Sequence, residues 1–472
     1  MNSRPNLVLL AASLGVLIAQ IDTSVVNLAV KPIAADLGSS VSAMQWMIDA
    51  YNLVYAALLL TAGALGDLYG RRRVFVVGIA LLGVGSAVCA VAPGTAVLLA
   101  GRALQGLGAA LEVPMSLVLL SLAFPEAAAR QRALGIWASC NGLAFIVGPT
   151  LGGLLVEAIG WRSVFYLILP LCVPAVLLAR KGIAESASPA GRRLDVGGQL
   201  AAIAALGGLA FAAIEGAHLG WGSPLVLVAA GVAALGAAAF VLVERRSPHG
   251  LVPFELFGNA QFSASLAIAG LMTFCMYTMI FLMPLSFQVI RGDSALVAGL
   301  RMLPMSVAFF LVSQKSGRIV GAIGARASLA GGMALIALCQ ILCGFAPAGA
   351  AGGWEVALGF CIAGIGLGLG TAPVNSAAMA NAPKERAGTA SGLLNTARMV
   401  GATLGIAILG AVFAHFAGQG AAGEGFLPGL RAALLLGSAG TIAGAAIALA
   451  FIAREARTPF VTSAAPFPRP RR

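Results

Sequence analysis

Two long apolar stretches of the chain are separated by the sequence Gly63-Ala64-Leu65-Gly66-Asp67-Leu68-Tyr69-Gly70-Arg71-Arg72-Arg73. An acid and three consecutive arginines are costly in hydrocarbon, and glycines at this spacing are typical of a tight turn. The stretch therefore predicts a polar turn at which the chain leaves a membrane and re-enters it.

The composition of the whole chain agrees with a lipid environment. Of 472 residues, 60% are hydrophobic and 10% are charged, and the mean hydropathy is +0.96. An ordinary soluble domain is only about 45–50% apolar, so a soluble protein is excluded. The seven cysteines are scattered through the apolar stretches, and their odd number and spacing predict neither a disulfide framework nor a metal site.

Fourteen apolar stretches are long enough to cross a bilayer as helices, which takes about 20 residues each. They are predicted at Leu7–Val30, Met44–Leu65, Val74–Val91, Val97–Ala123, Leu134–Ala158, Val164–Leu178, Val196–Ile214, Leu225–Val243, Phe262–Val289, Ala298–Lys315, Ser328–Ala346, Val356–Ala377, Ala390–Phe416 and Leu430–Ala453. The first stretch stays apolar beyond any small-residue cleavage site and carries Asp22, so we interpret it as a retained span and not as a signal peptide.

The basic residues indicate the orientation. Most of the 29 Lys and Arg residues lie in alternate loops and at the two ends of the chain. The positive-inside rule then places both termini in the cytoplasm. Although the net charge is +12, it is divided among short loops, so we expect no nucleic-acid partner. The proline- and arginine-rich residues 454–472 are predicted to be a disordered cytoplasmic tail.

An internal repeat divides the chain into halves. The segment Ser316–Arg326 has the skeleton of the first turn, although Gly321 replaces its acid. Two such turns predict two six-helix bundles with two helices inserted between them. The fold class is an all-α polytopic membrane protein with 14 transmembrane helices. We expect an N-terminal bundle at 1–180, a linker with the inserted helices at 181–260, a C-terminal bundle at 261–453 and the tail at 454–472.

The polar turn also resembles a known motif. Its residues Gly63, Leu65, Asp67, Gly70, Arg71 and Arg72 match the cytoplasmic signature loop of the major facilitator superfamily. The positive-inside rule alone explains the arginines but not the spacing of the glycines and the acid. The number of spans resembles the fourteen-helix drug:proton antiporter branch of this family. The resemblance implies a secondary transporter and not an enzyme.

Further motifs cover most of the chain. Ile21–Val30 resembles the first-helix signature of that branch, although Lys31 precedes the expected proline, and Arg102–Ala110 resembles its arginine motif. The fifth span resembles the antiporter motif, which is found in exporters and generally lacking in importers; its residues here are Gly142, Gly148, Pro149, Gly152 and Gly153. Of these matches, the antiporter motif bears most directly on the direction of transport.

Of the charged residues inside predicted spans, where charge is expensive and usually functional, four are candidate site residues. Asp22, Asp49 and Arg102 are expected at a similar height near the outer side. We hypothesise that the two acids exchange a proton or bind a cationic substrate, and that Arg102 modulates their affinity. The alternatives are a polar helix end for Asp22, an interfacial position for Asp49 and a snorkelling arginine. Glu112 lies deeper, and either binds protons or substrate or makes a structural hydrogen bond.

The resemblance also suggests residues that control conformation. Asp67 is expected to face the amino end of a helix in the other half, with Arg71 and Glu126 completing a charge cluster that latches the inner side shut. The glycines and proline of the fifth span are expected to form a hinge. Arg398 lies within a span resembling helix 13 of the branch and requires a partner that the sequence does not identify.

These features predict a multi-pass plasma-membrane exporter of small lipophilic or cationic compounds such as drugs and antibiotics. With no nucleotide-binding loop, its energy source would be a proton gradient, and we expect no cofactor or metal and a monomeric state. A proton-coupled importer of a nutrient is one alternative. A non-transporting sensor on the same scaffold is another.

Overall fold

The protein is described by a computed structural model. It covers residues 4–187, 194–246, 252, 254–346, 353–381, 387–417 and 425–453. Across these residues the structure is helical and contains no strand. The predicted tail at 454–472 and the basic residues 192 and 193 lie outside the described residues.

The helices follow the predicted order. The first half comprises α1 (Pro5–Leu37), α2 (Val41–Tyr69), α3 (Arg71–Ala90), α4 (Thr95–Ala123), α5 (Ala127–Ala158), α6 (Ser163–Tyr166) and α7 (Ile168–Gly182). Next come α8 (Val196–Leu219), α9 (Pro224–Arg246) and the short 3-10 helix η1 (Phe254–Gly258). The second half comprises α10 (Ala260–Ile290), α11 (Ala295–Ile323), α12 (Ala325–Phe345), α13 (Gly353–Ala380), α14 (Ala387–Ala417) and α15 (Phe426–Phe451).

The predicted polytopic helical fold is confirmed. In the described part of the chain, 13 helical segments are long and apolar enough to cross a bilayer, or 14 when α2 is counted as one bent span. The bend in α2 is 59° and lies between Leu59 and Thr61. The sixth span is broken at Leu167 into α6 and α7. Most helices extend beyond their predicted bounds by several residues because the polar residues at their ends continue the helix.

The internal repeat has a counterpart in backbone geometry. The turn between α2 and α3 is made at Gly70, with φ 104°, and the turn between α11 and α12 is made at Gly324, with φ 82°. Only glycine adopts such positive φ values without strain. Each tight turn therefore depends on the glycine that the two sequence repeats have in common at this position.

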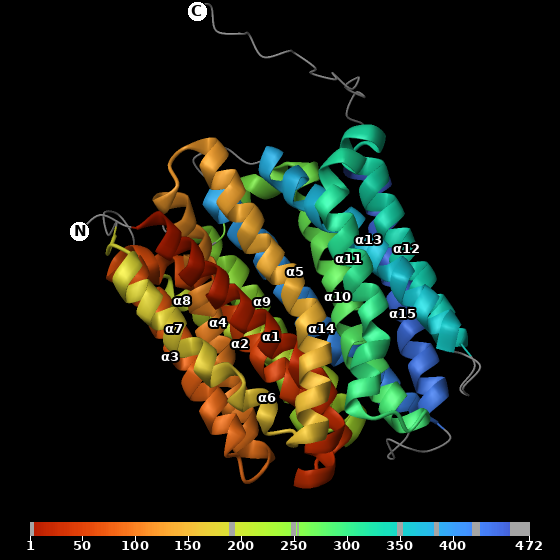
Figure 1. Ribbon diagram of the computed structural model, residues 1–472. Coiled ribbons are helices and arrows are strands. Elements are labelled where there is room, and N and C mark those ends of the chain that lie inside the picture. The colour runs from red at the N-terminus through yellow and green to blue at the C-terminus, as the bar shows by residue number, and fades with distance from the viewer. Residues whose placement is uncertain are drawn as a thin grey trace, which may run out of the picture.

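The helices form two bundles that lie side by side (Figure 1), and each is packed around a large hydrophobic core. One core is built almost entirely from α1 to α7, and the other mainly from α10 to α15. Along the boundary, α5 packs against α11 and α2 packs against α14. The inserted α8 packs on α9 and also on both α2 and α14, so it covers one seam between the halves.

The two halves are joined at one end of the bundle, the end that carries the turn between α3 and α4. We name this the outer end, following the predicted orientation. Among the described residues, four hydrogen bonds cross between the halves: Ser306 to the carbonyl of Phe145, Gln45 to that of Ile406, Gln288 to that of Leu28, and Lys31 to that of Gln288. The Ser306 bond lies near the middle of its helices and the other three lie nearer the outer end, so the two halves are in contact at that end.

Candidate functional site

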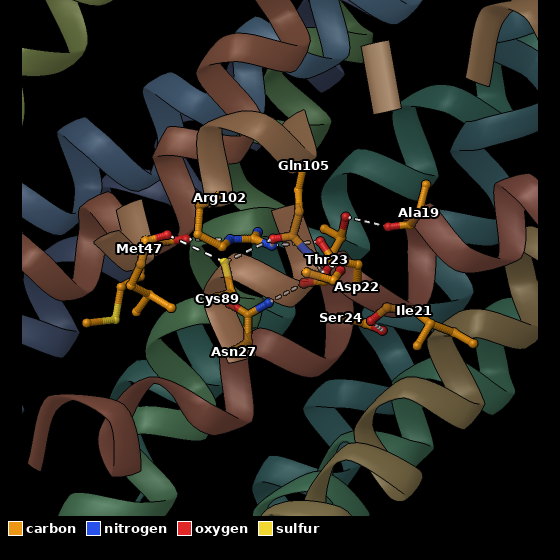
Figure 2. Close-up of polar contacts among 12 residues, drawn as sticks. Ala19, Ile21, Asp22, Thr23, Ser24, Asn27, Met47, Cys89, Arg102 and Gln105 are labelled. Atoms are coloured by element: carbon orange, nitrogen blue, oxygen red, sulfur yellow. Dashed lines mark hydrogen bonds and ion pairs between the residues drawn. The ribbon is translucent and has the colours of Figure 1, made fainter. Parts of the chain in front are cut away.

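Asp22 and Arg102 form an ion pair inside the first half. The Nη1 atom of Arg102 lies 2.6 Å from Oδ2 of Asp22, and each side chain is 1% exposed. Gln105 donates to the other carboxylate oxygen at 2.7 Å and to the hydroxyl of Ser86 at 2.7 Å. Figure 2 shows Asp22 of α1 and Arg102 and Gln105 of α4 pointing towards one another. The arrangement is a buried network of charged and polar groups, with both carboxylate oxygens satisfied.

Arg102 has further partners that fix its position. It donates from Nη1 to Gln105 at 2.8 Å and from Nε to the backbone carbonyl of Met47 in α2 at 2.8 Å (Figure 2). Its guanidinium also lies 4.7 Å from the ring centre of Tyr51. The arginine thus holds α2 against α1 and α4, and its burial rules out a surface position. Charge-assisted hydrogen bonds of this kind are among the strongest in proteins.

Asp49 is fully buried on α2, and neither of its carboxylate oxygens has a hydrogen-bond partner among the described residues. Gln45, one helical turn earlier on the same face, donates to the carbonyl of Ile406 in α14. Asn52 and Thr403 are likewise buried with side-chain atoms that lack partners. The seam between α2 and α14 therefore contains polar groups that its closed form leaves unsatisfied.

Glu112 is also fully buried, and both of its carboxylate oxygens lack a hydrogen-bond partner in the described part of the chain. It projects from α4 towards α1 and α3. A methyl group added to Gly15 of α1 would lie 2.8 Å from its Oε1 and 3.2 Å from the ring of Phe75. Glycine at position 15 thus leaves the space that this carboxyl occupies. Glu112 is seven residues, or about two helical turns, beyond Gln105 on the same face of α4.

The structure brings together some of the predicted latch residues and leaves Glu126 apart. Asp67 accepts from Arg71 at 2.7 Å, so this acid and this arginine are brought together. Glu126 is exposed at the start of α5, and among the described residues no ion pair joins it to this cluster. Instead, Glu185 accepts from the backbone N–H groups of Arg72 and Arg73 at 3.1 and 3.2 Å.

The glycine and proline motif of α5 lies where three helices meet. Methyl groups added to Gly148 and Gly152 would overlap the side chains of Ser24 and Val25 of α1. A methyl group on Gly153 would lie 2.7 Å from the carbonyl oxygen of Ala295 in α11. Gly142 lies near Phe310 of α11. The motif therefore permits close packing of α5 both within its own half and against the other half.

Gly299 of α11 completes this contact, because a methyl group there would overlap the carbonyl oxygen of Pro149. We expect Gly299→Ala to weaken the outer closure and expose the seam. A cysteine introduced at the buried Gln45 should then react several-fold faster with an impermeant maleimide added from outside. Gly317→Ala, on the same helix with no atom within 4 Å of its added methyl, is the matched control. Equal reactivity in both variants would contradict this role.

Sequence reasoning missed three supporting residues. Gln105 lies inside the quoted arginine motif, and its position three residues after Arg102 places both on one helical face, which was the available signal. Glu185 is an acid within a basic segment. Gly15 carries no signal in the sequence, because the need for space becomes visible only when α1 lies against α4.

The sequence of the chain matches a family model. Residues 12–406 match the model of the Major Facilitator Superfamily. The chain belongs to this family. The resemblance seen in the signature turn is thereby confirmed, and the protein is a transporter and not an enzyme.

Relatives within the family are drug and antibiotic resistance proteins. The chain is 39% identical to the multidrug resistance protein Stp of Mycobacterium tuberculosis, over 88% of this chain and 77% of that protein. It is 32% identical to the tetracenomycin C resistance and export protein of Streptomyces glaucescens, over 89% of this chain and 78% of that one. The family, these relatives and the many apolar helices support a multi-pass membrane protein that exports drugs.

A solved structure of the peptide transporter POT in complex with sulfate has the same fold. Its TM-score is 0.69 at 15% identity, and the match covers 94% of this chain and 94% of that one. At this identity the likeness shows the fold alone.

Proposed function

We propose that the protein exports small lipophilic or cationic compounds across the plasma membrane in exchange for protons, as a monomer with both termini in the cytoplasm. The observation that carries the proposal is the presence of two fully buried carboxyl groups, Asp49 and Glu112, with no hydrogen-bond partner among the described residues. Acids at this depth are expensive and are kept where they bind something.

The surroundings of these carboxyl groups suggest how their protonation is coupled to the conformational change. An ionised Asp49 would have no counter-charge in the closed outer seam, so this closed state favours the neutral form. Loss of the proton from Asp49 would destabilise the closed contact between α2 and α14 and so favour its opening. The Asp22–Arg102 pair lies in the same half, and it offers a guanidinium that can exchange partners as the helices move.

The proposed direction of transport, out of the cell, is based on the relatives and on the sequence motif in α5. The named relatives confer resistance or carry out export. The α5 motif, which resembles that of antiporters, lies at the contact with α11, where the two halves must separate. The closed outer end leaves the inner end as the side from which cargo enters in this state.

Inverted membrane vesicles with an acidic lumen test this function. We expect vesicles containing the protein to accumulate ethidium, and we expect the accumulation to stop when nigericin collapses the pH difference. Vesicles without the protein are the control. Accumulation that persists after the gradient is removed would contradict proton exchange.

Asp67→Asn tests the proposed latch. Because the variant loses the charge that pairs with Arg71 at 2.7 Å, we expect ethidium transport to slow several-fold while ethidium binding is unchanged. Asp36→Asn, which removes a carboxylate from the surface ion pair with Arg162, is the control and should transport normally. Normal transport by the Asp67 variant would rule out the latch.

A further inference from the structure

Arg398 lies deep in the second half of the molecule. It is the twelfth residue of α14 (Ala387–Ala417), roughly 16 Å along the helix from its inner end at 1.5 Å per residue. Its side chain remains partly accessible. It is therefore a cationic group near the middle of a span that is not completely sealed by its neighbours.

The partners of Arg398 are neutral. Nη2 donates to the amide oxygen of Asn375 in α13 at 2.9 Å, and Nη1 donates to that of Asn395 at 3.4 Å. Nε is buried with no acceptor. Among the described residues, no carboxylate lies within 4.0 Å of this guanidinium, so its charge and one of its donors are left uncompensated.

Two other arginines inside predicted spans are paired with acids. Arg102 pairs with Asp22 at 2.6 Å, and Arg301 pairs with Asp293 at 2.6 Å. A charge at membrane depth without a counter-ion is costly, and such residues mark ligand pathways. Arg102 also lies inside a span, but it has both an acid and a backbone carbonyl as partners. This contrast indicates that Arg398 binds an anion that the protein itself does not provide.

The surroundings of Arg398 reach into the other half. Thr273 of α10 donates to the backbone carbonyl of Arg398 at 2.7 Å, and Tyr277 lies one helical turn further along α10 on the same face. Met399, the next residue on α14, packs against the cores of both halves. The guanidinium therefore lies beside the boundary along which a transported molecule would move.

We propose that Arg398, with Tyr277 and Asn375, binds an anionic group of the cargo, such as a carboxylate. A planar guanidinium with a free donor matches a carboxylate by paired hydrogen bonds, and the tyrosine hydroxyl can supply another donor. The inference depends on the proposed transport function, and it extends the range of cargo from cationic compounds to lipophilic acids.

The test is binding of matched probes to the purified protein in lipid nanodiscs at neutral pH. The probes are 2-naphthoate and its neutral amide, 2-naphthamide. We expect naphthoate to bind roughly tenfold to a hundredfold more tightly, because a hydrogen bond to a charged group is worth more than one between neutral groups. Arg398→Gln should remove this preference, and Arg398→Lys should retain part of it.

Arg431→Gln is the matched control, because this arginine of α15 donates to the carbonyl of Gly344 and its loss should leave the preference intact. Thermal unfolding of each variant checks that it is folded. Equal binding of the two probes to the wild-type protein, or a preference that survives in Arg398→Gln, would overturn the anion site. Ethidium transport by the same variants in inverted membrane vesicles separates this result from failure of the proposed function, since proton-driven export of a cation does not require the anion site.

Discussion

Glu112→Gln is expected to abolish proton-coupled export while the protein still folds. The carboxyl has no hydrogen-bond partner among the described residues, so its replacement by an amide of the same size breaks no ion pair. It does remove the group that is proposed to bind and release the proton. We expect ethidium accumulation in energised vesicles to fall at least tenfold. A tenfold change corresponds to about 1.4 kcal/mol of free energy.

The control for this variant is Glu157→Gln, which neutralises an exposed carboxylate of α5 and should leave export unchanged. A thermal midpoint close to that of the wild type would show that Glu112→Gln remains folded. If the folded variant still accumulated ethidium at the wild-type rate, Glu112 would have no part in the mechanism.

Arg102→Gln is expected to destabilise the protein strongly. The substitution leaves Asp22 buried without its cation, and breaking one partner of a buried pair typically costs about 3–5 kcal/mol. It also removes the hydrogen bond that holds the carbonyl of Met47 on α2. We expect a marked fall in the thermal midpoint in nanodiscs, together with loss of transport.

The double variant Arg102→Gln/Asp22→Asn separates the two effects. Replacing both partners removes the uncompensated charge, so we expect most of the stability to return while transport remains absent. Double-variant stability no better than that of Arg102→Gln alone would show that the cost does not arise from the stranded carboxylate.

Much of the fold was predictable because the bilayer constrains it. The lengths of the apolar stretches, the repeat at Gly70 and Gly324 and the charges in the loops are properties of the chain that need no tertiary information. The grouping of Asp22 with Arg102 was also predictable, because two opposite charges at similar depth stabilise one another.

Other features depend on how helices are rotated against each other. The space that Gly15 leaves for Glu112, and the amide of Asn375 that receives Arg398, arise between helices far apart in sequence. No periodicity within one helix specifies such pairs. Similarly, Glu185 reaches the N–H groups of Arg72 and Arg73 only because the chain after α7 returns beside the turn between α2 and α3.

The most direct measurement of the central claim is proton movement during transport by the purified protein. Proteoliposomes would enclose ethidium at neutral pH, and a pH-sensitive dye outside would report protons leaving or entering as ethidium is exchanged. We predict a proton flux opposite to the flux of ethidium that disappears in Glu112→Gln. Ethidium movement with no accompanying proton flux in the wild-type protein would contradict the account.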